Sequence, residues 1–189
     1  MSFERTLNEQ EISLTLNGER VRAWAPSRMH AADFLRQRLG RTGTHVGCEQ
    51  GVCGMCTVMV DGQAVKSCLM LAAQLDGAEV CTVESLAEEN GNLNALQQAF
   101  KKHHGLQCGF CTPGFLMLAT SLAARGEAMS REQIRDEVSG VLCRCTGYEG
   151  IVRAVEEYLS VQQAEGSRFR QAEGSRHAEG AQQAMEAQS

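Results

Sequence analysis

Four cysteines constrain this chain more than any other feature of its sequence. Cys48, Cys53 and Cys56 share one short loop, and Cys68 follows twelve positions after Cys56. This C-x4-C-x2-C…C spacing is one by which four thiolates surround the two irons of a 2Fe–2S cluster. Glycines inside the loop let its backbone turn at positive φ and bring its N–H groups close to the sulfur atoms. The sequence therefore predicts a plant-type 2Fe–2S site in this part of the chain.

Length and charge limit what else the chain can be. Its 189 residues suffice for one ordinary domain or two small ones, and leave no room for a flavin domain and a large catalytic domain as well. A net charge of −5 without any basic run argues against non-specific nucleic-acid binding. We expect no secretory signal and no membrane span, because the chain starts with polar sequence and no apolar run approaches roughly 20 residues. Nine clustered cysteines then indicate a cytoplasmic protein whose thiols bind metal.

The first half of the chain has the pattern of a small sheet with one helix. Alternating apolar residues on both sides of Asn17-Gly18 predict a β-hairpin. A helical stripe over residues 29–39 follows. Beyond the cysteine loop, a second hairpin turns at Asp61-Gly62, and a short strand is expected over residues 80–83. These elements predict an α+β domain, over residues 10–84, in which the helix crosses a mixed sheet.

The second half, residues 85–162, is predicted to hold four helices. The first ends near His103, and the second starts with Thr112 as N-cap and proline at its first position. Ser130 and Thr146 each begin a capping box, which predicts the starts of the third and fourth helices.

A repeat marks the end of the chain. The sequence Gln-Ala-Glu-Gly-Ser-Arg occurs at residues 163–168 and again at 171–176. Such a segment has too little apolar surface to offset its ordering entropy. Residues 163–189 are therefore predicted to be a disordered tail without catalytic content.

Four more cysteines form a second constellation in the helical half. Cys108 and Cys111 make a C-x2-C pair, and Cys143 and Cys145 make a C-x-C pair. Each pair comes directly before a predicted helix start, where unpaired N–H groups and the helix dipole stabilise a bound anion. An anionic 2Fe–2S cluster suits that environment, although a C-x2-C pair with a distant partner pair also suits structural zinc. The residues alone leave both metals open.

Three segments together resemble the small iron–sulfur subunit of the xanthine oxidase family of molybdenum hydroxylases. This family includes xanthine dehydrogenases, aldehyde oxidoreductases and aerobic carbon monoxide dehydrogenases. The segments are Cys48-Glu-Gln-Gly-Val-Cys53-Gly-Met-Cys56-Thr-Val, Gln107-Cys-Gly-Phe-Cys111-Thr-Pro-Gly and Leu142-Cys-Arg-Cys-Thr-Gly-Tyr148. The resemblance covers roughly residues 10 to 160. It implies a plant-ferredoxin-like β-grasp domain followed by a four-helix-bundle domain, each holding one 2Fe–2S cluster.

The resemblance also implies roles for individual residues. Gln107 would hydrogen-bond the molybdopterin cofactor of a partner subunit, and Cys145 would bridge the second cluster and that pterin. No catalytic residue is expected in this chain, because substrate residues of the family belong to the large subunit. The implied ligands are Cys48, Cys53, Cys56 and Cys68 for the first cluster and Cys108, Cys111, Cys143 and Cys145 for the second.

The resulting expectation is an electron-transfer subunit of a molybdenum hydroxylase. Electrons would pass from molybdopterin on a large partner through the helical-domain cluster and the ferredoxin-like cluster to FAD on a medium partner, in a doubled heterotrimer. The alternatives are a free-standing 2Fe–2S electron carrier and a zinc-stabilised interaction module. The sequence does not give the substrate, the direction of the net reaction or the terminal electron acceptor.

Three residues near these motifs are interpreted as structural. Cys81, the ninth cysteine, falls in a strand pattern and is predicted to pack in the core. His45 lies three residues before Cys48, but a Rieske site would need two histidines in place of two cysteines, so we interpret His45 as a loop residue. Phe110, between Cys108 and Cys111, is predicted to pack in the core.

Overall fold

Two β-hairpins supply four of the five strands of the sheet. The structure is a computed structural model, and it describes residues 8–88 and 90–164. Both hairpins turn through a pair of residues with positive φ, at Asn17-Gly18 and at Asp61-Gly62, as a two-residue hairpin turn requires. Both predicted hairpins are confirmed. Their strands are β1 (Glu9–Leu16), β2 (Glu19–Pro26), β3 (Thr57–Val60) and β4 (Gln63–Lys66).

A fifth strand joins the two hairpins into one mixed sheet. The strand order is β2-β1-β5-β3-β4, and β5 (Glu79–Cys81) runs parallel to β1 and antiparallel to β3. The predicted mixed sheet is therefore confirmed. The alternating residues Ile12, Leu14 and Leu16 of β1 are buried in one core with Phe34. Short 3-10 helices complete this half, over Ser67–Leu69, Ala72–Leu75 and Val83–Leu86.

The segment predicted as one α-helix over residues 29–39 is helical, but most of it is not an α-helix. A single α-turn, α1 (Ala31–Asp33), runs into a π-helix over Phe34–Arg38. The backbone N–H of Leu39 donates to the carbonyl of Phe34, five residues back, at 3.2 Å. The apolar side chains still face the sheet, so the periodicity in the sequence did not distinguish the two kinds of helix.

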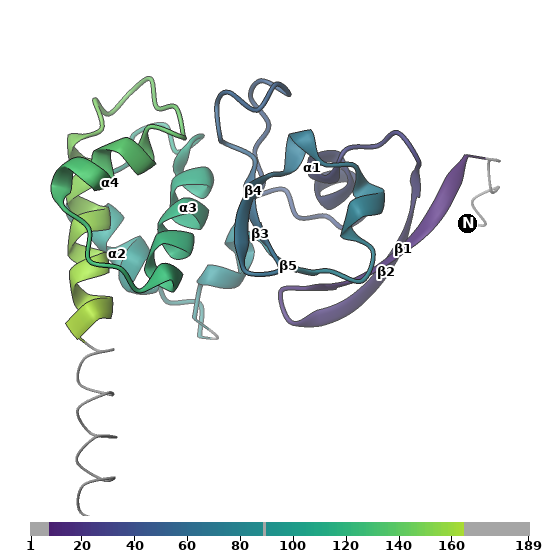
Figure 1. The fold of residues 1–189 in the computed structure, drawn as a ribbon, viewed down its shortest axis with the longest axis horizontal. Coiled ribbons are helices and arrows are strands. Elements are labelled where there is room, and N and C mark those ends of the chain that lie inside the picture. Colours follow the sequence, from purple (N-terminus) through teal and green to yellow (C-terminus); the bar gives the residue numbers. More distant parts are fainter. Residues whose placement is uncertain (1–7, 89, 165–189) are drawn as a thin grey trace, which may run out of the picture.

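Residues 90–164 contain four helices around a separate apolar core. They are α2 (Ala95–Lys102), α3 (Thr112–Arg125), α4 (Arg131–Val138) and a helix over residues 149–164, which is yellow-green in Figure 1. The capping box predicted at Ser130 is present, with the Ser130 side chain accepting from the N–H of Gln133. α3 begins at Thr112, with Cys111 rather than Thr112 as its N-cap, and it ends at Gly126 with φ of 67°.

The capping box predicted at Thr146 is wrong. Helical structure resumes only at residue 149, because Tyr148 has a φ of 69° and interrupts the turn. The Thr146 hydroxyl accepts from the N–H of Tyr148 at 3.2 Å. Instead of reaching back to Thr146, the carboxylate of Glu149 pairs with Arg131 and Arg153.

α3 connects the two halves. Figure 1 shows it between the sheet and the other helices, and it packs against β3. A Cβ atom on Gly114 of α3 would lie 2.6 Å from the carbonyl oxygen of Gly54 in the cysteine loop, so only glycine permits this approach. That loop and the segment after α4 lie at the same end of the molecule, at the top of Figure 1.

The tail predicted from residue 163 lies, from residue 165 onward, outside the described residues. Within the described part of the chain, no helix combines the length and the apolar character that crossing a membrane requires.

Candidate iron–sulfur sites

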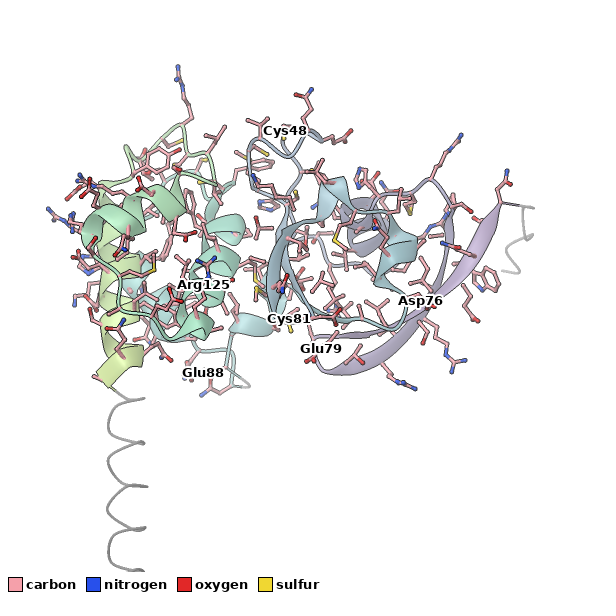
Figure 2. All side chains as sticks on the ribbon, in the orientation of Figure 1. Cys48, Asp76, Glu79, Cys81, Glu88 and Arg125 are labelled. Carbon is pink, nitrogen blue, oxygen red and sulfur yellow. The ribbon has the colours of Figure 1, made fainter. Side chains whose placement is uncertain are left out.

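The first cysteine loop follows the π-helix and leads into β3. The guanidinium of Arg36 holds the approach to the loop by donating to the carbonyls of Thr42 at 2.6 Å and Thr44 at 2.8 Å. The loop then extends from Cys48 to Cys56, beyond one end of the sheet (Figure 2, where Cys48 is labelled). Its position is therefore set by the helix before it and the strand after it.

The β3–β4 hairpin brings Cys68 back beside Cys56. Cys56 stands directly before β3, and Cys68 lies in the 3-10 turn directly after β4. Ser67 donates its backbone N–H, at 3.3 Å, and its hydroxyl, at 2.7 Å, to the carbonyl of Cys56. Both thiols are buried together beside Ala32. The hairpin register thus places two cysteines that are distant in the sequence next to each other.

The thiols of the first set lie in contrasting electrostatic environments. The sulfur of Cys48 accepts the backbone N–H groups of Cys53 and Gln50, each at 3.4 Å. These hydrogen bonds, that of Cys53 first, lower the pKa of the Cys48 thiol to about 6. Burial, followed by the neighbouring Cys56 side chain, raises the pKa of Cys68 to about 11. Donors are therefore in place for a thiolate at Cys48, which is the form of cysteine that binds iron.

The second set brings together two segments from either side of α3 and α4. Cys108 and Cys111 lie in the turn before α3, and the sulfur of Cys108 is 3.6 Å from that of Cys145. The thiol of Cys111 interacts with that of Cys143. Burial, and then Cys143, raise the pKa of Cys111 to about 12, whereas the neighbouring Cys108 side chain raises the pKa of Cys145. One pair, Cys108 and Cys145, is exposed, and Cys111 of the other pair is buried.

Two residues to which the sequence assigned no role at the site support Cys143. Burial alone would raise the pKa of its thiol, but the hydroxyl of Thr146, 3.1 Å from the sulfur, and the Thr146 N–H, at 3.4 Å, help to lower it. The hydroxyl of Tyr148 accepts the N–H of Cys143 at 2.8 Å, and its ring packs edge-on against Phe115. These hydrogen bonds to Cys143 could not be predicted from the sequence, where the Thr146 hydroxyl is equally suited to cap a helix.

Two contacts join the first set to the second. The N–H of Leu142 donates to the carbonyl of Cys53 at 2.9 Å. The Nδ1 atom of His45 lies 2.7 Å from the carbonyl oxygen of Phe110, and the two rings stack with centroids 4.7 Å apart. Phe110 is 46% exposed, so the prediction that it packs in the core is wrong. His45 is more than a loop residue, because it connects the two cysteine-bearing segments.

The remaining cysteine lies apart from both sets. Cys81 is on β5, opposite Met59 of β3, and Figure 2 shows it at the far end of the sheet from Cys48. It is half-buried, and burial raises the pKa of its thiol. Cys81 lies outside the buried core clusters, so the prediction that it packs in the core is wrong, although it does lie away from both cysteine sets.

The donor chemistry of both sets fits a 2Fe–2S cluster. Within residues 8–88 and 90–164, no three or more His, Cys, Asp or Glu side chains converge on a point suited to a single metal ion. For each of these thiols the strongest interaction with another thiol is pairwise: Cys48 with Cys53, Cys56 with Cys68, Cys108 with Cys145 and Cys111 with Cys143. A 2Fe–2S cluster takes four thiolates over two irons, two at each iron.

Two further features of these segments suit such a group. A Cβ atom on Gly47 would lie 2.8 Å from the sulfur of Met55 and 3.3 Å from that of Cys53, so a glycine lets the chain pass close to this thiol. The hydroxyl oxygen of Thr112, next to Cys111, is buried and has no hydrogen-bond partner among the described residues. A bound sulfide would supply the missing acceptor.

The fold and the paired thiols define a protein with two successive 2Fe–2S binding domains. Sequence models of two families match the chain. One is a 2Fe-2S iron-sulfur cluster binding domain, over residues 14–96, and the other is a [2Fe-2S] binding domain, over residues 82–156. The iron–sulfur alternative, left open against zinc at the second set, is therefore the one that the comparison supports.

Close relatives extend over nearly the whole described chain. The caffeine dehydrogenase subunit gamma of Pseudomonas sp. (strain CBB1) is 52% identical over 153 residues, which cover 79% of this chain and 91% of the relative. The nicotine 6-hydroxylase small subunit of Paenarthrobacter nicotinovorans is 52% identical over 145 residues, with 77% and 87% covered. The crystal structure of quinoline 2-oxidoreductase from Pseudomonas putida 86 superposes with a TM-score of 0.79 at 48% identity, covering 86% of this chain and 98% of that chain.

The chain belongs to the small 2Fe–2S subunits of the xanthine oxidase family of molybdenum hydroxylases. It is an iron–sulfur subunit of an oxidoreductase, with an electron-transfer role. The predicted family, function class and cofactor type are confirmed, and the free-standing electron carrier is not favoured.

Proposed function

We propose that this chain conducts electrons between a molybdopterin site on a large partner subunit and FAD on a medium partner subunit. The observation that carries this proposal is the direct connection of two four-cysteine sets, since the N–H of Leu142, next to Cys143, donates to the carbonyl of Cys53. One hydrogen bond therefore links the backbone of a candidate ligand of the first set to the residue next to a candidate ligand of the second set. A 2Fe–2S cluster, when bound, supplies a one-electron acceptor and donor at each set.

The eight paired cysteines are the proposed iron ligands. Each interacting pair would share one iron, so that each set would hold both irons of its cluster. The chain contributes the electrostatic surroundings, through N–H donors to Cys48 and the two donors of Thr146 to Cys143. The first cluster is assigned to Cys48, Cys53, Cys56 and Cys68, and the second to Cys108, Cys111, Cys143 and Cys145.

The exposed thiol pair suggests which cluster faces the molybdopterin subunit. Cys108 and Cys145 are exposed, and so is Gln107 beside them. We assign this end to the molybdopterin, with Gln107 as a hydrogen-bonding residue and Cys145 as the bridge between cluster and pterin. The first set would then face the FAD subunit. Its rim carries two exposed apolar side chains, Val52 and Leu69, which suit a contact with another protein.

The finer organisation follows the family resemblance. We propose a ferredoxin-like domain over residues 10–84, a four-helix-bundle domain over residues 85–162 and a doubled heterotrimer with both partners. A cytoplasmic location accords with nine cysteines that are all free thiols. Residues 163–189 would have no part in electron transfer.

The names of the relatives suggest a substrate class for the whole enzyme. Caffeine, nicotine and quinoline, which appear in these names, are all nitrogen heterocycles. We propose that the assembled enzyme oxidises a compound of this class at the large subunit. Assays of the purified complex with these three compounds would test that part of the proposal separately.

Cysteine-to-serine variants test whether the proposed cysteines bind the two clusters. We expect Cys56→Ser to abolish one EPR signal of the dithionite-reduced complex and Cys111→Ser to abolish the other, because each removes a ligand of one cluster. Iron analysis should give about four irons per chain in the unaltered complex, two for each 2Fe–2S cluster. Cys81→Ser is the matched control and should keep both signals. If either ligand variant keeps both signals at full strength, its cysteine is not a ligand.

A further inference from the structure

Lys66 places a positive charge against the first cysteine loop. It is the last residue of β4, two positions before Cys68, and its side chain is half-buried. Its Nζ atom donates to the carbonyl oxygen of Gly51 at 2.6 Å. Gly51 lies between Cys48 and Cys53, so the ammonium group contacts the part of the loop enclosed by two proposed ligands.

The loop is held tightly at this contact. Gly51 has a φ of 73°, and a Cβ atom there would lie 2.4 Å from Cδ1 of Leu69. The side chain of Leu69 therefore covers Gly51, while Lys66 binds the carbonyl of the same residue. The ammonium group is thus fixed in position relative to the loop rather than free to move through solvent.

The charge of Lys66 is not balanced by a nearby carboxylate. Among the described residues, no Asp or Glu oxygen lies within 4.0 Å of its Nζ atom, although several other basic side chains form such ion pairs. A half-buried and unpaired cation interacts with a neighbouring charge more strongly than one in bulk water. Reduction of a 2Fe–2S cluster adds one negative charge at that position.

We propose that Lys66 raises the reduction potential of the ferredoxin-like cluster and so helps this cluster to accept the electron. This inference rests on the proposed function, because it assumes that the first cysteine set holds a cluster. The ammonium group favours the reduced state electrostatically, and its hydrogen bond to Gly51 keeps it at a constant position. Lys66 is a positioning and tuning residue, since it contacts the loop and not the irons.

The test is an EPR-monitored redox titration of the whole complex with three changes. Lys66→Gln keeps a hydrogen-bond donor and removes the charge, whereas Lys66→Arg keeps the charge. Lys101→Gln, the same change at an exposed lysine of α2, is the matched control. The EPR signal of the first cluster is identified as the one that Cys56→Ser abolishes.

We expect Lys66→Gln to move the midpoint potential of the first cluster to a lower value and to leave that of the second cluster in place. Lys66→Arg should stay near the unaltered protein, and Lys101→Gln should change neither cluster. The proposal is overturned if Lys66→Gln leaves the first potential unchanged or shifts both potentials equally. It is also overturned if Lys66→Arg shifts the potential as far as Lys66→Gln, because the loop shape rather than the charge would then be responsible.

This outcome can be separated from a failure of the proposed function. If the unaltered complex showed fewer than two 2Fe–2S signals, the proposed electron transfer through two clusters would be wrong. If it shows both signals and only the midpoint potentials of the Lys66 variants differ from those expected, the proposed electron-transfer function is retained and the role of Lys66 is withdrawn.

Discussion

Thr146 controls the hydrogen bonding of one sulfur atom. Its hydroxyl and its backbone N–H both reach the thiol of Cys143, which is one of the proposed ligands of the second cluster. Donors to a ligand sulfur stabilise the extra negative charge that arrives on reduction. The second cluster should therefore depend on this threonine for part of its reduction potential.

We expect Thr146→Val to lower the midpoint potential of the second cluster, because valine keeps the shape of threonine and removes the hydroxyl. Thr146→Ser, which retains the hydroxyl, should remain close to the unaltered protein. Redox titration of the complex with EPR detection measures both variants. An unchanged potential in Thr146→Val would show that the hydroxyl does not act on the cluster.

At the scale of single residues, spacing in the sequence identifies the cysteines but not the residues that surround them. The two C-x2-C patterns are local, so they can be read without a structure. Lys66 reaches Gly51 across fifteen residues, and that contact depends on the β3–β4 register. Thr146 was assigned to a helix cap because a hydroxyl at such a position serves either purpose.

At the scale of elements, the close approach of α3 to the cysteine loop depends on one glycine. Gly114 lies in the first turns of α3, and a Cβ atom there would lie 2.6 Å from the carbonyl oxygen of Gly54. Inside a helix, alanine is normally more stable than glycine by about 1 kcal/mol. The packing against Gly54 should reverse this preference.

We expect Gly114→Ala to destabilise the protein by about 1–3 kcal/mol, as overpacking does in a closely packed interface. Ala124→Gly, at an exposed position of the same helix, is the matched control. There the ordinary preference for alanine applies, so this exchange to glycine should destabilise the protein by about 1 kcal/mol. Urea unfolding of the cluster-loaded protein measures both. A stabilised Gly114→Ala variant would contradict the close contact.

The elements that could be predicted are those with strong local signals. Asn17-Gly18 and Asp61-Gly62 fix the two hairpins, and Ser130 with Gln133 fixes the start of α4. The π-helix over Phe34–Arg38 could not be distinguished from an α-helix, because both bury the same apolar side chains. Tyr148 has a positive φ, which a tyrosine side chain does not favour. The sequence therefore predicts a helix start at Thr146, whereas the helix begins at residue 149.

At the scale of the whole molecule, the last helix is tied to α2 by an ion pair. The carboxylate of Glu157 lies 2.7 Å from Lys102 and 2.6 Å from His103. Lys102 first, and then His103, hold the pKa of Glu157 below its ordinary value of 4.5. A lowered folded-state pKa means that the stabilisation is present at neutral pH and is lost as the pH falls through the folded-state pKa.

Glu157→Gln should therefore unfold at a lower urea concentration than the unaltered protein at pH 7. The difference between the two should narrow as the pH falls below about 4.5, where the carboxyl of the unaltered protein begins to take up its proton. Glu19→Gln, at an exposed carboxyl without an ion pair among the described residues, is the control. A difference that stays constant with pH would rule out the ion pair as its source.

The exposed pair Cys108 and Cys145 has a consequence for how the protein is made. Their sulfur atoms are 3.6 Å apart, and a disulfide requires about 2.0 Å. Little movement separates these thiols from a covalent bond that would block their cluster. We therefore expect oxidation of these exposed thiols to compete with cluster assembly more than oxidation of the buried Cys56 and Cys68 does.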